Sequence, residues 1–219
     1  MDRYVVMSEF AKSLFAAGGL PSGKLAVKPN FAHPDPGPRD GPGTYVLFSG
    51  RLSEEKGLKV LLEAWKKLKP NARLEILGDG PLAGWLAQQV NGCPKIDCRG
   101  WLPREQALEA VKGACLLVAP SVCYEGSPLV VLEAFAAGVP VVASRIGSLA
   151  EIVEHGRTGL LATAGDPEDL AAMLDRVLAS PSQAAAMGRE ARLEFETHYT
   201  AAANYEQLMR IYEAARRHA

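Results

Sequence analysis

Residues 115–143 read CLLVAPSVCYEGSPLVVLEAFAAGVPVVA and combine two apolar runs of strand length with one of helix length. Residues 115–119 and 139–143 are rich in valine and leucine, as buried strands are, and residues 129–137 fit a buried helix. A helix between two such strands usually forms a right-handed crossover that places both strands parallel in one sheet. This stretch therefore predicts an α/β fold.

The same alternation of strand and helix patterns continues in both directions from this unit. Further strands are expected at residues 45–49, 73–77, 96–98 and 159–162, and further helices at residues 54–69, 82–90, 105–112, 151–154 and 168–178. About six strands separated by helices predict a doubly wound parallel sheet with helices on both faces.

The two ends of the chain have a different character. Residues 4–7, 10–17 and 25–28 fit a strand, a helix and a strand, and residues 34–43 are rich in proline and glycine, which is typical of a linker. From residue 183 onward the pattern is helical. Both ends are expected to pack against another structural unit.

The composition is that of an ordinary globular protein and argues against several classes. The chain has 219 residues with 24 Lys and Arg against 25 Asp and Glu, so a nucleic-acid binder with a strongly basic surface is not expected. The most apolar stretch, residues 128–144, is interrupted by charge, glycine and proline, so no transmembrane segment is expected. No apolar signal core follows the first residues, and we expect a cytoplasmic protein.

The cysteines and histidines do not form a metal-binding pattern. Cys93, Cys98, Cys115 and Cys123 match neither a C-x-x-C pair nor a zinc framework, and the histidines are scattered. We therefore expect no metal site, and we interpret the cysteines as small buried residues in a reducing compartment.

The loops that follow the strands are the first places to search for a site, because ligands of open parallel sheets bind beyond the carboxyl ends of the strands. The loop after residues 45–49 contains Gly50, which permits a sharp turn, and Ser53, a good N-cap. Arg51 and Lys56 flank the expected helix start, where free N–H groups and the dipole favour an anion. This loop is a candidate anion site.

Other interpretations of this region stay open at this point. Arg51 and Lys56 are also compatible with surface charges that pair with Glu54 and Glu55. No G-x-G-x-x-G follows the first strand of the core and no P-loop motif occurs, so neither of those phosphate sites is expected. The Gly-Asp-Gly at residues 78–80 fits a plain tight turn.

The loop after residues 115–119 is the second candidate region. Ser127 followed by Pro128 matches an N-cap and a first helical residue, so free N–H groups are expected from Gly126 to Leu129.

Glu133 is the sole charged residue among residues 128–144. Burial of a lone carboxylate is costly, so Glu133 is expected to have polar partners or to face a ligand. A ribose or sugar diol would suit it, because a carboxylate accepts from two vicinal hydroxyls. Glu125 lies near the same helix start. The alternative is that Glu133 lies on an exposed stripe and Glu125 is an ordinary loop charge.

In order and spacing, these segments resemble the C-terminal, donor-binding half of a family 4 (group 1) glycosyltransferase with the GT-B fold. The resemblance runs from Tyr45 to about Leu178 and rests on Ser49-Gly50-Arg51-Leu52, Glu55-Lys56-Gly57, Gly78-Asp79-Gly80-Pro81, Gly100 with Leu102, Pro120-Ser121, and the spaced pair Glu125 and Glu133. It implies that residues 44–180 are a Rossmann-like nucleotide-sugar-binding domain. Residues 1–43 would be the remnant of an N-terminal domain with an interdomain segment and linker, and residues 181–219 helices that cross back.

The resemblance also implies roles for the matching residues. Arg51 and Lys56 would bind the donor diphosphate and stabilise the leaving group, and Glu133 would hold the ribose hydroxyls. Glu125 would act with them at the donor sugar or its phosphates. The backbone around Trp101 and Leu102 would contact the nucleotide base. The other donor-binding positions would be Ser49, Gly50, Gly126, Ser127, Pro128 and Leu129.

For the reaction, the resemblance implies metal-independent, retaining hexosyl transfer from a UDP-, GDP- or ADP-sugar, without a cofactor. The catalysis would be electrostatic and would not use a carboxylate nucleophile as glycosidases do. One departure from the family is Gly147-Ser148, where members commonly carry two glycines.

The resemblance leaves the acceptor open. Its site would belong to an N-terminal domain or a partner chain, so this chain alone is expected to be inactive or weakly active, and its ends could also self-associate. A further domain could hold the protein peripherally at a membrane. The alternatives are a stand-alone donor-binding or assembly subunit without activity, and a GT-B sugar-nucleotide epimerase.

Overall fold

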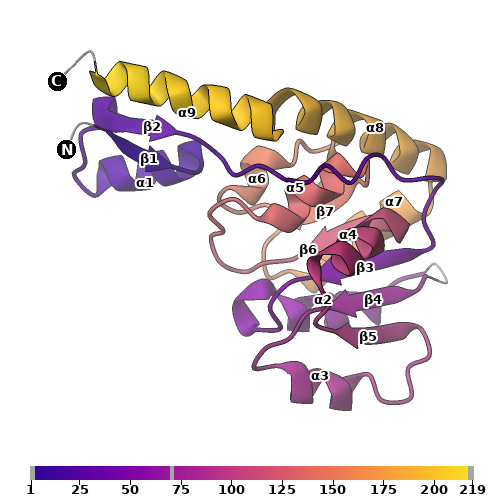
Figure 1. Cartoon of the computed structure of the whole chain (residues 1–219). Coiled ribbons are helices and arrows are strands. Elements are labelled where there is room, and N and C mark those ends of the chain that lie inside the picture. The colour runs from indigo at the N-terminus through magenta and orange to yellow at the C-terminus, as the bar shows by residue number, and fades with distance from the viewer. Residues whose placement is uncertain (1–2, 70–71, 217–219) are drawn as a thin grey trace.

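The structure is a computed structural model that describes residues 3–69 and 72–216, and its centre is a six-stranded parallel sheet (Figure 1). The strands lie in the order β5-β4-β3-β6-β7-β8. Their bounds are β3 Tyr45–Ser49, β4 Leu74–Leu77, β5 Ile96–Gly100, β6 Ala114–Ala119, β7 Val141–Ser144 and β8 Gly159–Ala162. Helices cover both faces, so the predicted doubly wound parallel sheet is confirmed.

Alternation along the strands distributes the side chains between two helix layers. In β3, Leu47 packs in one hydrophobic cluster while its neighbours Val46 and Phe48 pack in the other, on the opposite face. The first layer contains α4 Arg104–Gly113, α5 Leu129–Ala136, α6 Leu149–Ile152 and α8 Pro181–His198. The second contains α2 Leu58–Trp65, α3 Ala83–Gln89 and α7 Pro167–Leu178.

The strand order reverses between β3 and β6. From β3 the chain moves outward through β4 to β5, and then returns to the other side of β3 to form β6. Loops that leave neighbouring strands toward opposite faces separate at such a switch point and open a crevice at the carboxyl ends. The loops after β3 and β6 are therefore placed on the two sides of this crevice.

The first residues form a separate unit, in which β1 Tyr4–Val6 and β2 Leu25–Val27 pair as a two-stranded parallel sheet. The helix α1 Glu9–Ala17 and the 3₁₀ turn η1 Ser22–Lys24 connect the two strands. At the other end of the chain, α9 Ala201–Arg216 extends from α8 toward the side of the molecule on which this unit lies (Figure 1).

The segment predicted as a linker has no regular secondary structure, but it is anchored to the core. Both guanidinium nitrogens Nη1 and Nη2 of Arg192 contact the carboxylate of Asp35, at 2.7 and 2.8 Å. The guanidinium of Arg39 donates to the carbonyl of Ala114 at 2.6 Å. These contacts bind the segment to α8 and to the start of β6.

The single helix predicted for residues 54–69 is wrong, because Gly57 divides it. Residues Glu54–Lys56 form a 3₁₀ turn, η2, and α2 begins only after Gly57, whose φ is 71°. The hydroxyl of Ser53 donates to the carboxylate of Glu55 at 2.6 Å, and Ser53 does not cap α2 as predicted. A left-handed residue between the two segments re-aims the chain after Lys56.

Three smaller expectations also need correction. The strand predicted at residues 96–98 continues to Gly100, and the short helix predicted at residues 151–154 lies at Leu149–Ile152. Cys93 and Cys98 are exposed and the other two cysteines are half-buried, so their interpretation as buried residues is wrong.

Candidate active site

Lys56 and Glu125 meet at the switch point of the sheet. They lie 69 residues apart, yet the Nζ of Lys56 contacts both carboxylate oxygens of Glu125, at 2.6 and 2.8 Å. The hydroxyl of Ser121 donates to the same carboxylate at 2.6 Å. Only 29% of the Lys56 side chain and 14% of the Glu125 side chain are exposed, so water screens this pair less than it screens a surface ion pair. For Lys56, the alternative of a surface pair with Glu54 or Glu55 is wrong.

Backbone contacts hold the two loops against each other. The N–H of Val122 donates to the carbonyl of Glu55 at 2.9 Å. Gly57 lies so close to the other loop that a Cβ atom on it would stand 1.8 Å from the carbonyl oxygen of Pro120. The left-handed glycine is therefore what allows the loop that carries Lys56 to reach the loop that carries Glu125.

Ser148 supports Glu125 from the loop after β7. Its side chain is fully buried, and its hydroxyl donates to the carbonyl of Glu125 at 2.7 Å. The neighbouring Gly147 has a φ of 50°, and a Cβ atom there would lie 3.1 Å from the Tyr124 ring. Of the Gly147-Ser148 pair, it is therefore Gly147 that needs to lack a side chain, because the Tyr124 ring lies close to its backbone. The position of Ser148 accommodates a side chain, and its hydroxyl contributes a hydrogen bond.

A cavity of about 360 Å³ opens along the carboxyl ends of β3, β4 and β5. It is lined by Ser49, Gly50, Arg51, Leu77, Gly78, Asp79, Trp101, Leu102 and Ala107. The Trp101 side chain is 71% exposed, whereas Leu102 packs against the core. Gly78 and Asp79 belong to this lining, and the N–H of Leu52 donates to the carbonyl of Asp79 at 2.9 Å, which joins the turn after β4 to the loop after β3.

Arg51 is exposed and makes no ion pair with any residue in the described ranges. The pKa of Glu55 lies below its usual value, first because Ser53 donates a hydrogen bond to it and to a smaller degree because Arg51 and Lys56 are near. Arg51 is thus a cation at the edge of the cavity whose guanidinium is available for hydrogen bonds.

The predicted N-cap at Ser127 is wrong. Helix α5 begins at Leu129 after Pro128, without a side-chain cap. The Ser127 hydroxyl instead accepts the N–H of Asn30 at 3.2 Å, and its carbonyl accepts from the Asn30 side-chain amide at 2.8 Å. Because proline has no N–H, the expected row of donors is reduced to Gly126, Ser127 and Leu129. The segment after β2 therefore braces the start of α5.

Glu133 has a polar partner, as its isolation in an apolar stretch predicted. The Nη1 of Arg104, the first residue of α4, lies 3.1 Å from its Oε1, and 14% of the Glu133 side chain is exposed. Burial raises the pKa of Glu133, and the charge and hydrogen bond of Arg104 oppose this shift. The Nη2 of Arg104 donates to the carbonyl of His33 at 2.8 Å.

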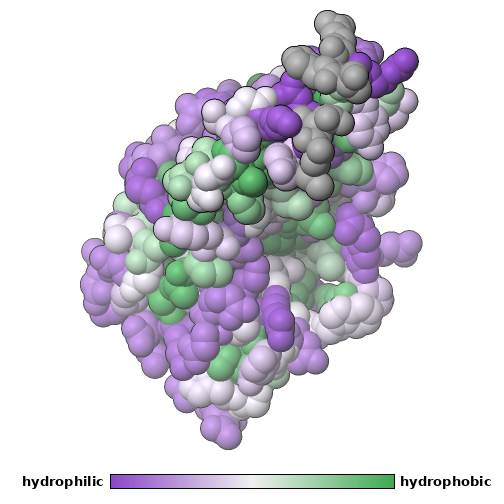
Figure 2. Space-filling view, turned by 90° about the vertical axis from the view of Figure 1, so that its left-hand side faces the viewer, coloured by the Kyte–Doolittle hydropathy of each residue, from purple (hydrophilic) through white to green (hydrophobic). Residues whose placement is uncertain are grey.

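All the predicted site residues lie at the carboxyl edge of the sheet, but they do not border one cavity. Ser49 lines the cavity described above and also a narrow space of about 20 Å³ that contacts Lys56, Glu125 and Pro128. Leu129 and Glu133 border neither space. The carboxyl ends face the left of Figure 1, and Figure 2, which looks from that side, shows a recess with hydrophobic residues inside and hydrophilic residues around it.

The sequence interpretation assigned no contact to four residues that shape this edge, namely Asn30, Arg104, Ser121 and Ser148. Arg104 had a detectable signal, because it is a cation at the start of the helix that follows a strand of the sheet. Ser121 and Ser148 were noted only within Pro120-Ser121 and Gly147-Ser148, because no local pattern predicts which partner a serine or asparagine of a loop will bind.

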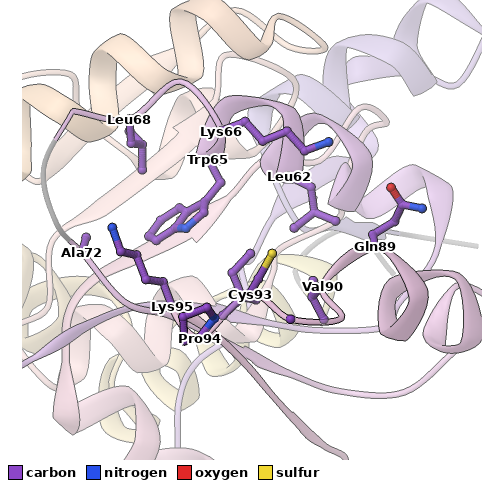
Figure 3. A pocket seen from close by; sticks show the side chains of 12 residues that line it. Leu62, Trp65, Lys66, Leu68, Ala72, Gln89, Val90, Cys93, Pro94 and Lys95 are labelled. Atoms are coloured by element: carbon purple, nitrogen blue, oxygen red, sulfur yellow. The ribbon is translucent and has the colours of Figure 1, made fainter.

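A second cavity, of about 370 Å³, lies at the opposite end of the sheet, where β5 begins. Figure 3 shows the side chains of Trp65, Pro94 and Lys95 around it. Because it lies at the amino ends of the strands, it is separate from the candidate site.

Within residues 3–69 and 72–216, the structure has no helix with the length and apolar character that a membrane span requires. Within the same ranges, the side chains do not gather into a group of three or more potential metal ligands.

The sheet with its switch point and the two joined loops define the Rossmann-like half of a GT-B fold. The chain belongs to the family described as glycosyl transferases group 1, whose family model matches residues 43–180. It is 35% identical over 173 residues to a sulfoquinovosyl transferase of Arabidopsis thaliana, covering 78% of this chain and 33% of that protein. It is 34% identical over 186 residues to a glycogen synthase of Mycobacterium tuberculosis, covering 82% of this chain and 44% of that protein.

Solved structures agree on the fold. Anabaena Alr3699/HepE in complex with UDP superposes with a TM-score of 0.86 at 21% identity, covering 97% of this chain and 64% of that chain. Sucrose-phosphate synthase from Thermosynechococcus elongatus also gives a TM-score of 0.86, at 23% identity, covering 98% of this chain and 58% of that chain. The chain spans 33–44% of the length of the first curated relatives.

Proposed function

We propose that this chain binds a nucleoside-diphosphate sugar at the carboxyl edge of its sheet and forms the donor-binding part of a retaining hexosyltransferase. The observation that carries the proposal is the contact between Lys56 and Glu125 at the switch point, next to the cavity that Arg51 borders. Ligands bind at this position in open α/β sheets.

The diphosphate would lie between the two cations. The Arg51 guanidinium has no ion-pair partner in the part of the chain that the structure describes, and Lys56 has three donors, of which the Glu125 carboxylate does not need all. The N–H groups of Gly126, Ser127 and Leu129 would add donors at the start of α5. As the glycosidic bond breaks, negative charge grows on the diphosphate, and these preorganised donors would stabilise it without a metal ion.

The nucleoside would occupy the cavity of about 360 Å³ at the carboxyl ends of β3, β4 and β5. The backbone near Trp101 and Leu102 would contact the base, with Ser49 and Gly50 at the opposite wall. Glu133 would accept hydrogen bonds from the ribose hydroxyls. Glu125 would orient Lys56 and contact the donor sugar. The complexes of Anabaena Alr3699/HepE with UDP and with UDP-glucose support a nucleotide-sugar donor.

The acceptor site would lie on an N-terminal domain or a partner chain. The unit of β1, α1 and β2 supports this, because a two-stranded parallel sheet is marginal by itself and parallel sheets are normally covered on both faces. Val5, Met7, Leu14 and Phe15 on this unit are about half exposed. We propose that residues 1–43 are part of that interface and that residues 44–180 are the donor domain. Residues 181–219 would be the crossing helices. Sedimentation of the chain alone would distinguish self-association from the need for another domain.

Calorimetry with UDP, GDP, ADP and their glucose conjugates, in the presence of EDTA, tests the donor site. We expect at least one nucleotide to bind without metal, and a ligand at 100 times its Kd to stabilise the fold by about 2.7 kcal/mol. If no nucleoside diphosphate binds to folded protein, the proposal is wrong. Incubation of the donor alone, followed by analysis of the sugar, distinguishes a transferase from an epimerase, which would isomerise it.

A further inference from the structure

Arg104 contacts the carboxylate of Glu133, the residue proposed to bind the ribose. Glu133 lies on α5, whose neighbours are β6, β7, α4 and α8. Of the charged groups on these elements, the one that acts on the Glu133 carboxyl is Arg104 of α4. Arg104 therefore favours the ionised form of this mostly buried carboxyl group and opposes the effect of burial.

The guanidinium is itself anchored. The Arg104 side chain is 48% exposed, and a free arginine at such exposure would sample many rotamers. Its Nη2, however, donates to the carbonyl of His33 in the segment that enters the core from β2. One nitrogen thus holds the backbone while the other, Nη1, contacts Glu133.

The geometry leaves one carboxylate oxygen available. Arg104 contacts Oε1 of Glu133, and no residue in the described ranges donates a hydrogen bond to Oε2. An ionised carboxylate with a free oxygen accepts from hydroxyls, whereas a protonated one loses part of that capacity.

We infer that Arg104 is a positioning residue for Glu133: its guanidinium, held by the His33 carbonyl, orients the carboxylate with Oε2 free to accept a hydroxyl of the nucleotide ribose. The ribose part of this inference rests on the proposed function. Arg104 acts through Glu133 and is not assigned a contact with the substrate.

The experiment compares the wild type with Arg104→Gln over pH 5.5–8.5, using whichever of UDP, GDP and ADP binds most tightly and its 2′-deoxy counterpart. Without the guanidinium, burial raises the pKa of Glu133 unopposed, so the carboxyl protonates as the pH falls. We expect Arg104→Gln to bind the ribonucleotide increasingly more weakly than the wild type as the pH falls, by at most about tenfold for a one-unit rise of the Glu133 midpoint, with the loss largely recovered at pH 8.5. The deoxynucleotide should be affected less.

Three variants serve as controls. Arg104→Lys keeps the charge and should restore most of the wild-type pH profile. Glu133→Gln should lose the preference for ribose at every pH. Lys112→Gln removes the other cation of α4, at its far end, and should leave the profile unchanged. A wild-type pH profile in Arg104→Gln would overturn the inference even where the nucleotide binds.

A ligand-free measurement separates this inference from the proposed function. In NMR titrations of carboxyl-labelled glutamate, Glu133→Gln identifies the Glu133 resonance, and its midpoint should rise by about one pH unit in Arg104→Gln. If no nucleotide binds but this midpoint rises, the proposed function fails while the action of Arg104 on Glu133 stands. An unchanged midpoint overturns the inference.

Discussion

Lys56 reaches the site because the next residue is a glycine. Gly57 has a φ of 71°, and its missing Cβ leaves room for the carbonyl of Pro120. Gly57→Ala should therefore destabilise the protein by well over the roughly 1 kcal/mol that a left-handed alanine costs by itself. The matched control is Gly165→Ala, since Gly165 has a φ of 79° and open space around it. Equal shifts of the urea midpoint in the two variants would contradict this account.

Lys56 itself should matter more for the diphosphate than for the fold. Lys56→Ala removes a charged donor, and we expect affinity for the nucleoside diphosphate to fall about 10- to 100-fold while the monophosphate loses less. Lys59→Ala is the control, because Lys59 pairs with Glu54 on the exposed surface. Calorimetry on both variants provides the comparison, and equal losses for diphosphate and monophosphate would argue against the assigned role.

At the scale of elements, two helical glycines should respond to alanine with opposite signs. Gly84 is exposed in α3 with nothing near its Cβ position, so Gly84→Ala should stabilise the protein by about 0.5–1 kcal/mol. Gly188 in α8 packs on the turn after α5, and a Cβ there would lie 2.2 Å from the carbonyl oxygen of Gly138. Gly188→Ala should lower the melting temperature despite its better helix propensity, and a rise in both variants would show that α8 can move away.

The strands were easier to predict than the helix boundaries. Residues 45–49 and 159–162 form β3 and β8 as predicted, because short apolar runs between turn residues have few alternatives. The helix over 54–69 was predicted too long because Leu58, Leu61 and Leu62 do have helical spacing. The 3₁₀ turn η2 ends before them at Gly57, where the chain lies against the backbone of Pro120. The spacing of residues 54–69 gives no information about this contact with a distant segment.

For the whole molecule, Tyr199 links stability to alkaline pH. It lies at the junction of α8 and α9, and its carbonyl accepts the N–H of Ala32. Burial raises the pKa of Tyr199 to about 12, above its usual value of 10.0. The unfolded chain therefore releases this proton first, so stability should fall as the pH rises through 10 toward 12, by up to about 1.4 kcal/mol per pH unit.

The Tyr199→Phe variant isolates this contribution. Its denaturation free energy should fall less steeply than that of the wild type between pH 10 and 11, while the two curves run parallel between pH 7 and 9. Parallel curves across the whole range would mean that the folded protein does not retain the Tyr199 proton.

The residue types of the site followed from the sequence, but their partners did not. Arg51, Lys56, Glu125 and Glu133 were identified as candidates from their loops and spacing. That Lys56 pairs with Glu125 depends on β3 and β6 becoming neighbours although β4 and β5 intervene along the chain. Strand order is decided by the packing of the whole domain.

The sequence by itself determined the alternation of strands and helices, the parallel sheet and the edge at which ligands would bind, because hydrophobic periodicity and turn residues are local properties. Only the tertiary structure decided three contacts. Arg104 holds Glu133, the N–H of Asn30 donates to the hydroxyl of Ser127, which was predicted to cap α5, and Ser148 supports Glu125. Each of these contacts joins segments distant in sequence, and a polar side chain takes whichever partner the fold brings within hydrogen-bond distance.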